Sequence, residues 1–165
     1  MKILTHPNPA LKQRALEVDP LSDNDLKRLV RTMAESMYGA PGVGLAAPQV
    51  GVLKRVICWD TDDKHGKLRV LFNPRIVEAS DETNLDDEGC LSVPGISVPV
   101  ERPIACVCEG EVQSGDTVRI EAEELLARIL QHETDHCDGI LILDRAAPEE
   151  RRAAIRRYTT GGREE

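Results

Sequence analysis

The spacing of hydrophobic residues predicts three helices in this chain. Apolar residues recur every three or four positions over residues 23–38, the period of a helix with one buried face. These residues are Leu26, Leu29, Val30, Met33 and Met37. Ser22 and Asp25 fit a capping pattern at its start. A second helical pattern covers about residues 122–138, and a third covers residues 148–158, running from glutamates to arginines as the helix dipole favours.

Short apolar runs between residues 50 and 107 predict strands. The runs are "RVICWD", "KLRVLFNP", "GISVPVE" and "PIACVCE", and "DTVRIEA" adds a further strand. No helical pattern lies between them to carry a parallel crossover, so we expect antiparallel pairing. Prolines make residues 1–21 irregular. We therefore expect one α+β domain over residues 1–165, with antiparallel sheets packed around the second helix, a helix near each end, and a tail to residue 165.

Composition excludes several classes of function. A net charge of -8 disfavours binding to nucleic acid, and one Trp, two Tyr and one Phe provide no platform for stacking bases. No apolar run is long enough to span a membrane, and the first residues lack the apolar core of a signal peptide. The five cysteines form no C-x-x-C pair and are expected to be thiols of a cytoplasmic protein.

The segment "LQHETDHCDG" predicts a metal site on the second helix. His132 and His136 are four residues apart, so both side chains lie on one helical face, with Glu133 beside the first. This face continues a stripe that starts with Leu125 and Ile129, which we expect to point into the core. Buried imidazoles and a carboxylate need partners that offset their loss of solvation, and a metal ion provides them.

A third protein ligand must come from another segment, and spacing alone does not identify it. Thiolate, carboxylate and imidazole are all chemically acceptable. Cys90 is the candidate among the cysteines, because "DDEGCLSVPG" shows no apolar alternation that calls for a buried thiol. The other cysteines are expected in the core: Cys58, Cys106, Cys108 and Cys137. Three protein ligands leave a fourth position for water, whose proton Glu133 would accept, so we expect metal-assisted hydrolysis of a carbonyl compound.

Three separated segments together resemble the peptide deformylase family: "GVGLAAPQ", "EGCLS" and "QHETDHCDG". The opening "HPNPAL" and the segment "LLARILQHE" are also similar, so the resemblance covers nearly the whole chain. It implies that Cys90, His132 and His136 bind the metal and that Glu133 is the general base and acid. It also implies that Gln49 and the backbone N–H of Leu91 hold the developing oxyanion.

The resemblance implies a substrate, a cofactor and a place of action. The family removes the formyl group from N-formylmethionine of nascent bacterial chains and releases formate. The cofactor would be one divalent ion, Fe2+ in the cell, which Zn2+, Ni2+ or Co2+ can replace. Relatives use a C-terminal helix to meet the ribosome, so the basic helix over residues 148–158 would allow weak docking there. No membrane or specific nucleic-acid partner is expected.

Further residues are expected around this centre. Apolar residues would line the pocket for the methionine side chain, and main-chain groups at Gly42 and Gly44 would pair with an extended peptide. The lining residues are Val43, Gly44, Leu125 and Ile129. Glu88 and Asp135 would orient the ligands through hydrogen bonds, with Arg102 pairing to one of them.

The chain departs from the family pattern at Glu124, where glycine is frequent, at Asp86, where apolar residues are common, and at Cys137, where leucine is usual. These departures leave the side-chain preference open, and a related enzyme for another formylated substrate is an alternative. A zinc endopeptidase is a second alternative, in which Cys90 is not a ligand. A non-catalytic module that binds N-terminal peptides is a third, and it would tolerate loss of Glu133.

Overall fold

The computed structural model describes residues 2–161, so most of the expected tail lies outside the described residues. All three predicted helices are present, with ends shifted by a few residues. The helices are α1 (Leu26–Gly39), α2 (Glu124–Cys137), α3 (Ile142–Arg145) and α4 (Pro148–Thr159), with short 3-10 helices η1 (Pro9–Lys12) and η2 (Ala47–Val50). The α3 turn was not predicted, because four residues are too few to show a helical period.

The strands form two antiparallel sheets. A five-stranded sheet has the order β1-β2-β3-β6-β7, and β4 and β5 form a separate two-stranded sheet. The strands are β1 (Gly44–Ala46), β2 (Val56–Trp59), β3 (Arg69–Ala79), β4 (Thr83–Cys90), β5 (Val93–Pro103), β6 (Ala105–Glu111) and β7 (Thr117–Glu123). Every pair of neighbouring strands is antiparallel, which confirms the prediction.

Helix α1 begins at Leu26, later than its sequence pattern predicts. The predicted capping by Ser22 and Asp25 is wrong, because Asp25 is the N-cap residue and makes no side-chain cap hydrogen bond. Instead, the carboxylates of Asp19 and Asp23 accept hydrogen bonds from backbone N–H groups two residues ahead, at 3.0 Å each. Such local bonds favour turns over helix, so the chain turns through this segment before the helix starts.

Strands β1 and β4 were not predicted. The sequence of β4 shows why this strand was missed. Its sequence, TNLDDEGC, has one buried residue, Glu88, while the residues around it are exposed or half-buried. A strand with charged residues on its exposed face and a carboxylate at its buried position has no apolar alternation to reveal it. The strand is defined by its pairing with β5, which begins at Thr83 and Pro103.

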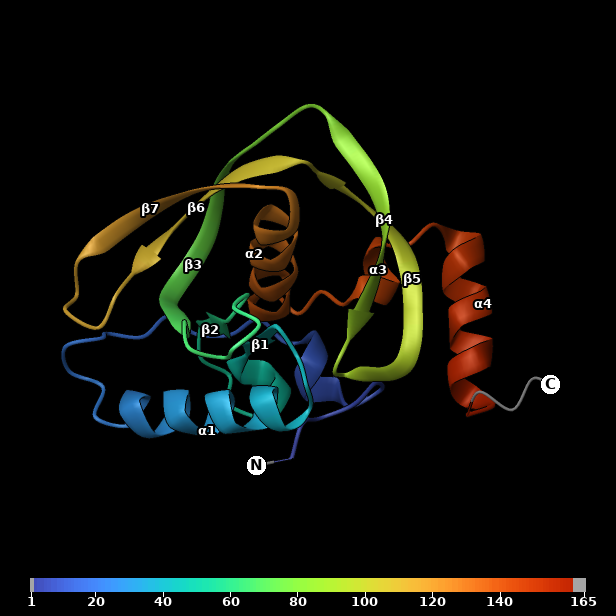
Figure 1. Cartoon of the computed structure of the whole chain (residues 1–165). Helices are drawn as coiled ribbons and strands as arrows, with labels where there is room; N and C mark the ends of the chain where they lie inside the picture. Colours follow the sequence, from blue (N-terminus) through green and yellow to red (C-terminus); the bar gives the residue numbers. More distant parts are fainter. Residues whose placement is uncertain (1, 162–165) are drawn as a thin grey trace.

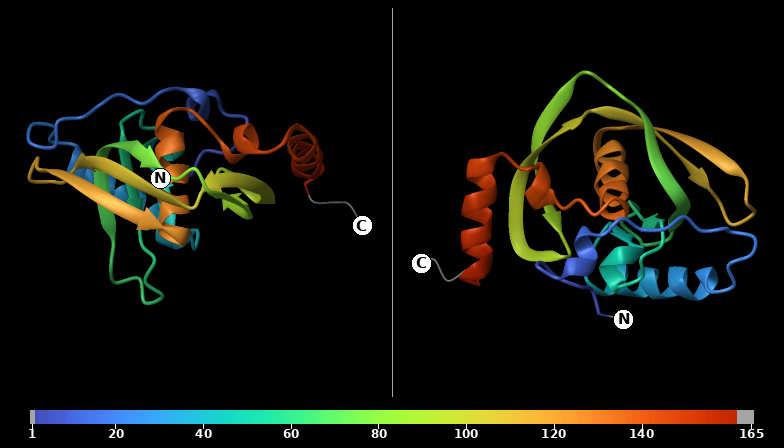
Figure 2. Two further views of the ribbon diagram at one scale, coloured as in Figure 1. Left: turned by 90° about the horizontal axis from the view of Figure 1, so that it is seen from above. Right: turned by 180° about the vertical axis from the view of Figure 1, so that it is seen from behind.

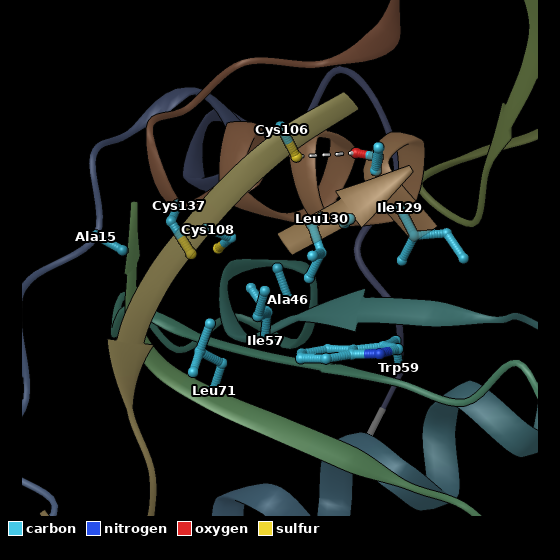
Figure 3. Packing of buried hydrophobic residues seen from close by; sticks show 12 residues of the cluster. Ala15, Ala46, Ile57, Trp59, Leu71, Cys106, Cys108, Ile129, Leu130 and Cys137 are labelled. Atoms are coloured by element: carbon cyan, nitrogen blue, oxygen red, sulfur yellow. Dashed lines mark hydrogen bonds between the residues drawn. The ribbon is translucent and has the colours of Figure 1, made fainter. Parts of the chain in front are cut away.

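Helix α2 lies in the middle of the molecule (Figure 1) and contacts strands of both sheets. Its apolar residues pack with strands β1, β2, β3 and β6 in one core cluster (Figure 3). Cys106, Cys108 and Cys137 belong to this cluster and Cys58 to the neighbouring one, which confirms their predicted places in the core. Complete burial of a side chain such as Leu130 stabilises the fold by roughly 1.5–3 kcal/mol, so this packing fixes α2 between the sheets.

Helix α4 lies beside β5 and packs against it (Figure 2). The buried Ala154 anchors it in a third core cluster that includes Val98 and Val100 of β5. None of the described helices is long and apolar enough to cross a membrane. Helices α2, α3 and α4 all contact β5, so these three helices hold the β4–β5 sheet in place.

Candidate metal centre and active site

The two histidines of the HExxH segment lie one turn apart on α2, with ring centroids 5.1 Å apart. The helix ends just after them. Gly139 follows the C-cap, as predicted, with a φ of 75°, and a Cβ there would lie 2.5 Å from the carbonyl oxygen of Lys12. Only glycine fits this left-handed position against a neighbouring backbone, so the sequence fixes where the helix stops.

Cys90, at the end of β4, lies opposite these histidines. Its Sγ is 3.4 Å from Nε2 of His136, and the candidate ligand atoms of Cys90, His132 and His136 lie within 4.8 Å of one another. In a tetrahedral site with metal–ligand distances of about 2.0–2.3 Å, ligand atoms stand roughly 3.5 Å apart. One thiol and two imidazoles at this spacing fit a divalent transition metal. Within residues 2–161, no other group of metal-binding side chains converges in this way.

Glu88 orients the imidazole ring of His132 through a contact with Nδ1. Its Oε1 lies 2.9 Å from Nδ1 of His132, which leaves Nε2 free to face the metal position. Burial opposes the charged form of Glu88, but hydrogen bonds from His132 and Arg102 outweigh it and lower the pKa of Glu88 to about 2. The carboxylate is therefore an anion that accepts a hydrogen bond from the imidazole. Burial lowers the pKa of His136 well below its usual value, and this favours the neutral ring that binds metals.

A network of buried ion pairs holds Glu88 in place. Arg102 donates to Glu88 from Nε at 2.5 Å and from Nη2 at 3.0 Å, and from Nη1 to Asp135 at 3.0 Å. Arg145 adds two hydrogen bonds to Asp135, at 2.8 and 3.0 Å. Arg102 thus pairs with both carboxylates, rather than with one as the sequence suggested. The network connects β4, β5, α2 and α3, so it fixes the elements that carry the candidate ligands relative to one another.

Arg128 is a member of this network that sequence reasoning missed. Its Nη1 donates to Glu88 and, at 3.0 Å, to the carbonyl oxygen of Val100, while Nη2 donates to the side chain of Asn84 at 2.9 Å. The guanidinium therefore joins α2 to both strands of the β4–β5 sheet. One signal was available, because a residue four positions before His132 lies on the same helical face.

Glu133 lies beside the candidate metal ligands. The side chain is buried, and its Oε1 makes no hydrogen bond among the described residues. Burial raises the pKa of Glu133 to about 7, although the charges of His132 and Arg102 oppose this. Gly44 packs directly against it, since a Cβ on Gly44 would lie 2.5 Å from Oε2 of Glu133. The carboxylate is thus poised to exchange a proton near neutral pH.

Gln49 reaches the metal position from η2. Its side-chain oxygen accepts a hydrogen bond from the backbone N–H of Ala46 at 3.0 Å, which fixes the orientation of the amide. The amide nitrogen then faces Oγ of Ser92 at 3.0 Å and Sγ of Cys90 at 3.7 Å. A fixed N–H donor close to Cys90 is suited to an oxyanion that forms beside the metal. Ser92 was not identified from the sequence.

A cavity of about 770 Å³ is lined in part by Gln49, Cys90, His132 and Glu133. Its wall includes the expected lining residues Val43, Gly44, Leu125 and Ile129, together with Leu91. The expectation that Leu125 points into the core is wrong, because 59% of this residue is exposed, whereas Ile129 is buried. Leu125 lies in the first turn of α2, at the wall of the cavity. Gly42 packs on Leu91, since a Cβ there would lie 2.6 Å from the leucine side chain.

Comparisons with known proteins agree with this geometry. The polypeptide deformylase family model matches residues 1–152. The peptide deformylase of Thermodesulfovibrio yellowstonii is 42% identical over 162 residues, 97% of each chain. The crystal structure of a peptide deformylase from Legionella pneumophila has a TM-score of 0.90 at 38% identity, covering 98% of this chain and 95% of that one. A Synechococcus elongatus peptide deformylase in complex with actinonin has a TM-score of 0.90 at 36% identity, covering 96% and 88%. This chain belongs to the polypeptide deformylase family.

Proposed function

We propose that the protein removes the formyl group from the N-terminal formylmethionine of newly made polypeptides, with Glu133 as the proton carrier. Cys90, His132 and His136 are the proposed metal ligands. The observation that carries this proposal is the convergence of these three side chains beside a buried carboxylate, one oxygen of which has no hydrogen bond among the described residues. Cys90, His132 and Glu133 line the same cavity. The proposed reaction is the hydrolysis of an amide, as the relatives' name, peptide deformylase, indicates.

A divalent ion held by Cys90, His132 and His136 would supply a Lewis acid that polarises the formyl carbonyl and acidifies water. Glu133 accepts the proton that the attacking water loses, and its pKa of about 7 suits this task at neutral pH. It then donates the proton to the methionine nitrogen as the C–N bond breaks, so that formate and a free amine leave. The amide of Gln49, with the backbone N–H of Leu91, stabilises the negative charge on the formyl oxygen.

The cavity wall suits an extended peptide that begins with methionine. Val43, Leu125 and Ile129 offer an apolar surface to an unbranched side chain. Strand β1, which starts at Gly44, is an edge strand of the five-stranded sheet, so only one of its edges pairs with a neighbouring strand of that sheet. A substrate chain can add to such an edge through main-chain hydrogen bonds. The close contacts of Gly42 and Gly44 with Leu91 and Glu133 bring this edge near the catalytic groups.

We assign Fe2+ as the metal in the cell, with Zn2+, Ni2+ and Co2+ as substitutes. Imidazole nitrogen and thiolate sulfur bind all four ions, so the ligand set alone supports the class of metal rather than one member. The five free thiols suit a reducing compartment, and we place the activity in the cytoplasm, where formylated chains are made.

The basic surface of α4 supports a weak docking contact with the ribosome. Arg152 and Arg156 are exposed and make no ion pair among the described residues, whereas Arg157 donates to the carbonyl oxygen of Ser97. Reversing these two charges in an Arg152→Glu, Arg156→Glu variant should abolish co-sedimentation with ribosomes at low salt while formate release from short peptides persists. Co-sedimentation that is unchanged by this double variant would refute the docking role.

Formate release from formyl-Met-Ala-Ser tests the enzymatic proposal directly. The protein is purified anaerobically and loaded with iron or nickel, and the metal content of every sample is measured. Glu133→Gln should keep the metal and lose activity by roughly 10²–10⁴-fold, the usual contribution of a general base. Formate release by the loaded variant at the wild-type rate would contradict the role of Glu133.

A Cys90→Ala variant separates this proposal from the zinc endopeptidase alternative. If Cys90 is a ligand, the variant should bind the metal much more weakly, whereas an endopeptidase with a different third ligand would keep it. The non-catalytic alternative is tested by the wild type, which would bind the peptide without releasing formate. The position of Cys90 Sγ, 3.4 Å from Nε2 of His136, favours the ligand role.

A further inference from the structure

The wall segment, residues 40–44, lines the substrate cavity along its whole length. Its sequence, APGVG, offers few side chains that could fix its conformation, since glycine leaves the backbone free. Gly42 packs closely on Leu91 at this wall. Gly44 packs equally closely on Glu133. A small shift of the wall segment would therefore change the space available to the substrate, and contacts from outside the cavity are needed to hold it.

Asp60 binds the wall segment from outside the cavity. The residue directly follows β2 and is only 4% exposed, yet it does not line the cavity. Its backbone N–H donates to the carbonyl oxygen of Val43 at 2.9 Å. Its carboxylate accepts hydrogen bonds from the backbone N–H groups of Asp62 at 2.9 Å and Lys67 at 3.2 Å. Asp60 thus joins the wall segment to the turn between β2 and β3.

Tyr38 binds the same carboxylate from α1. Its hydroxyl donates to Oδ2 of Asp60 at 2.5 Å, and the ring of His65 lies against its own ring at 5.2 Å. This hydrogen bond raises the pKa of Tyr38 to about 12 and lowers the pKa of Asp60. A neutral hydroxyl therefore donates to a charged carboxylate, which is a strong kind of hydrogen bond. Tyr38 before the wall segment and Val43 within it are both tied to Asp60.

We propose that Tyr38 and Asp60 are positioning residues that hold the wall segment against the bound peptide without touching the peptide themselves. This inference rests on the proposed deformylation. Loss of the hydroxyl should leave the catalytic groups in place, because Gly44 remains paired with Trp59 and the proposed metal ligands lie on α2 and β4. The wall should then bind the peptide less well in the ground state and the transition state alike, which raises KM and leaves kcat unchanged.

Tyr38→Phe tests this role, because it removes the hydroxyl and keeps the ring against His65. With formyl-Met-Ala-Ser as substrate, KM should rise roughly two- to tenfold, the range that corresponds to one hydrogen bond. The value of kcat and the metal content should match those of the wild type. An unchanged KM would overturn the inference. A fall in kcat without a rise in KM would also overturn it, because the effect would then lie on the catalytic groups.

Tyr158→Phe is the matched control. Tyr158 is the other tyrosine of the chain, and its hydroxyl donates to the carbonyl oxygen of His6 at 2.7 Å, away from this cavity. This variant should keep the wild-type KM and kcat, and the Tm of both variants shows whether they lose similar stability. An equal rise of KM in both variants would overturn the inference, since a general loosening of the fold would explain it.

A double-variant comparison shows whether Tyr38 acts through Asp60. If it does, Tyr38→Phe should raise KM no further in an Asp60→Ala background, whereas independent effects would multiply. Multiplied effects would overturn the role of Asp60. If Asp60→Ala does not fold, Tyr38→Phe and its control decide the inference alone. Failure of the wild type to release formate would instead refute the proposed function, and the positioning role with it.

Discussion

Replacement of Glu124 by glycine should stabilise the protein. Glu124 is the first residue of α2 and has a φ of 53°, in the left-handed region that residues with a Cβ rarely adopt. The side chain is exposed and has no hydrogen bond or ion pair among the described residues, so little is lost with it. The backbone N–H donates to the carbonyl oxygen of Ile104 at 3.0 Å, and glycine preserves that bond.

The magnitude follows from comparing glycine with alanine at this position. A left-handed conformation costs a residue with a Cβ roughly 1–2 kcal/mol. Both substitutions remove the attraction between the carboxylate and the helix dipole, roughly 0.3–1 kcal/mol at an exposed site. Glu124→Ala should therefore destabilise the protein by that amount alone. Glu124→Gly should be about 1 kcal/mol more stable than Glu124→Ala, or roughly 2–4 °C in Tm for a chain of this size.

Urea unfolding and thermal melting of the metal-loaded variants measure this difference. Glu121 is the matched control, because it is exposed and lies within strand β7, where the backbone is extended. At that position the order should reverse, with alanine more stable than glycine by roughly 0.5–1 kcal/mol. If glycine were no more stable than alanine at residue 124, strain at this position would be refuted. If the glycine and alanine variants had the same order of stability at residue 124 and at the control position, strain at residue 124 would also be refuted.

Other predictions concern the active site. The pKa of Glu88 is lowered from 4.5 to about 2, so its interactions should stabilise the metal-free protein by about 3 kcal/mol above pH 4.5 and lose that contribution as the pH falls toward 2. Urea unfolding from pH 6 to pH 3 should therefore show a weaker pH dependence in Glu88→Gln. Gln49→Ala should lower kcat roughly 10²–10³-fold with little change in KM or metal content, since it removes a donor to the oxyanion; a normal kcat would exclude that role. Gly44→Ala should retain the metal but lower kcat, because its Cβ would lie 2.5 Å from Oε2 of Glu133 and displace the carboxylate. A normal kcat would show that Glu133 adapts.

The sequence predicted the elements whose patterns are local. Leu26, Leu29, Met33 and Met37 are all buried on one face of α1, because the helical period depends on neighbouring residues alone. Gly139 marked the end of α2 because its backbone conformation excludes a side chain. The HExxH spacing likewise placed two imidazoles on one face of a single helix.

Features that depend on distant contacts were not predictable in the same way. Strand β4 has a buried glutamate where a pattern search expects an apolar residue, and only its network of arginines explains why that charge is tolerated. Leu125 continues the stripe of Ile129, yet it lies at the wall of the cavity and 59% of the residue is exposed. Spacing alone left the third ligand open, and β4 brings Cys90 to the histidines only through its pairing with β5.

The two carboxylates of the centre show how environment divides their tasks. Glu88 and Glu133 are both buried and both lie near His132, but their pKa values are shifted in opposite directions, to about 2 and about 7. Glu88 is surrounded by guanidinium groups that hold it ionised, so it can orient His132 but cannot carry a proton at neutral pH. One oxygen of Glu133 has no hydrogen bond among residues 2–161, so burial dominates and its proton can move. Exchanging these environments would exchange the roles, because the two identical side chains differ in their burial, their hydrogen bonds and the charges around them.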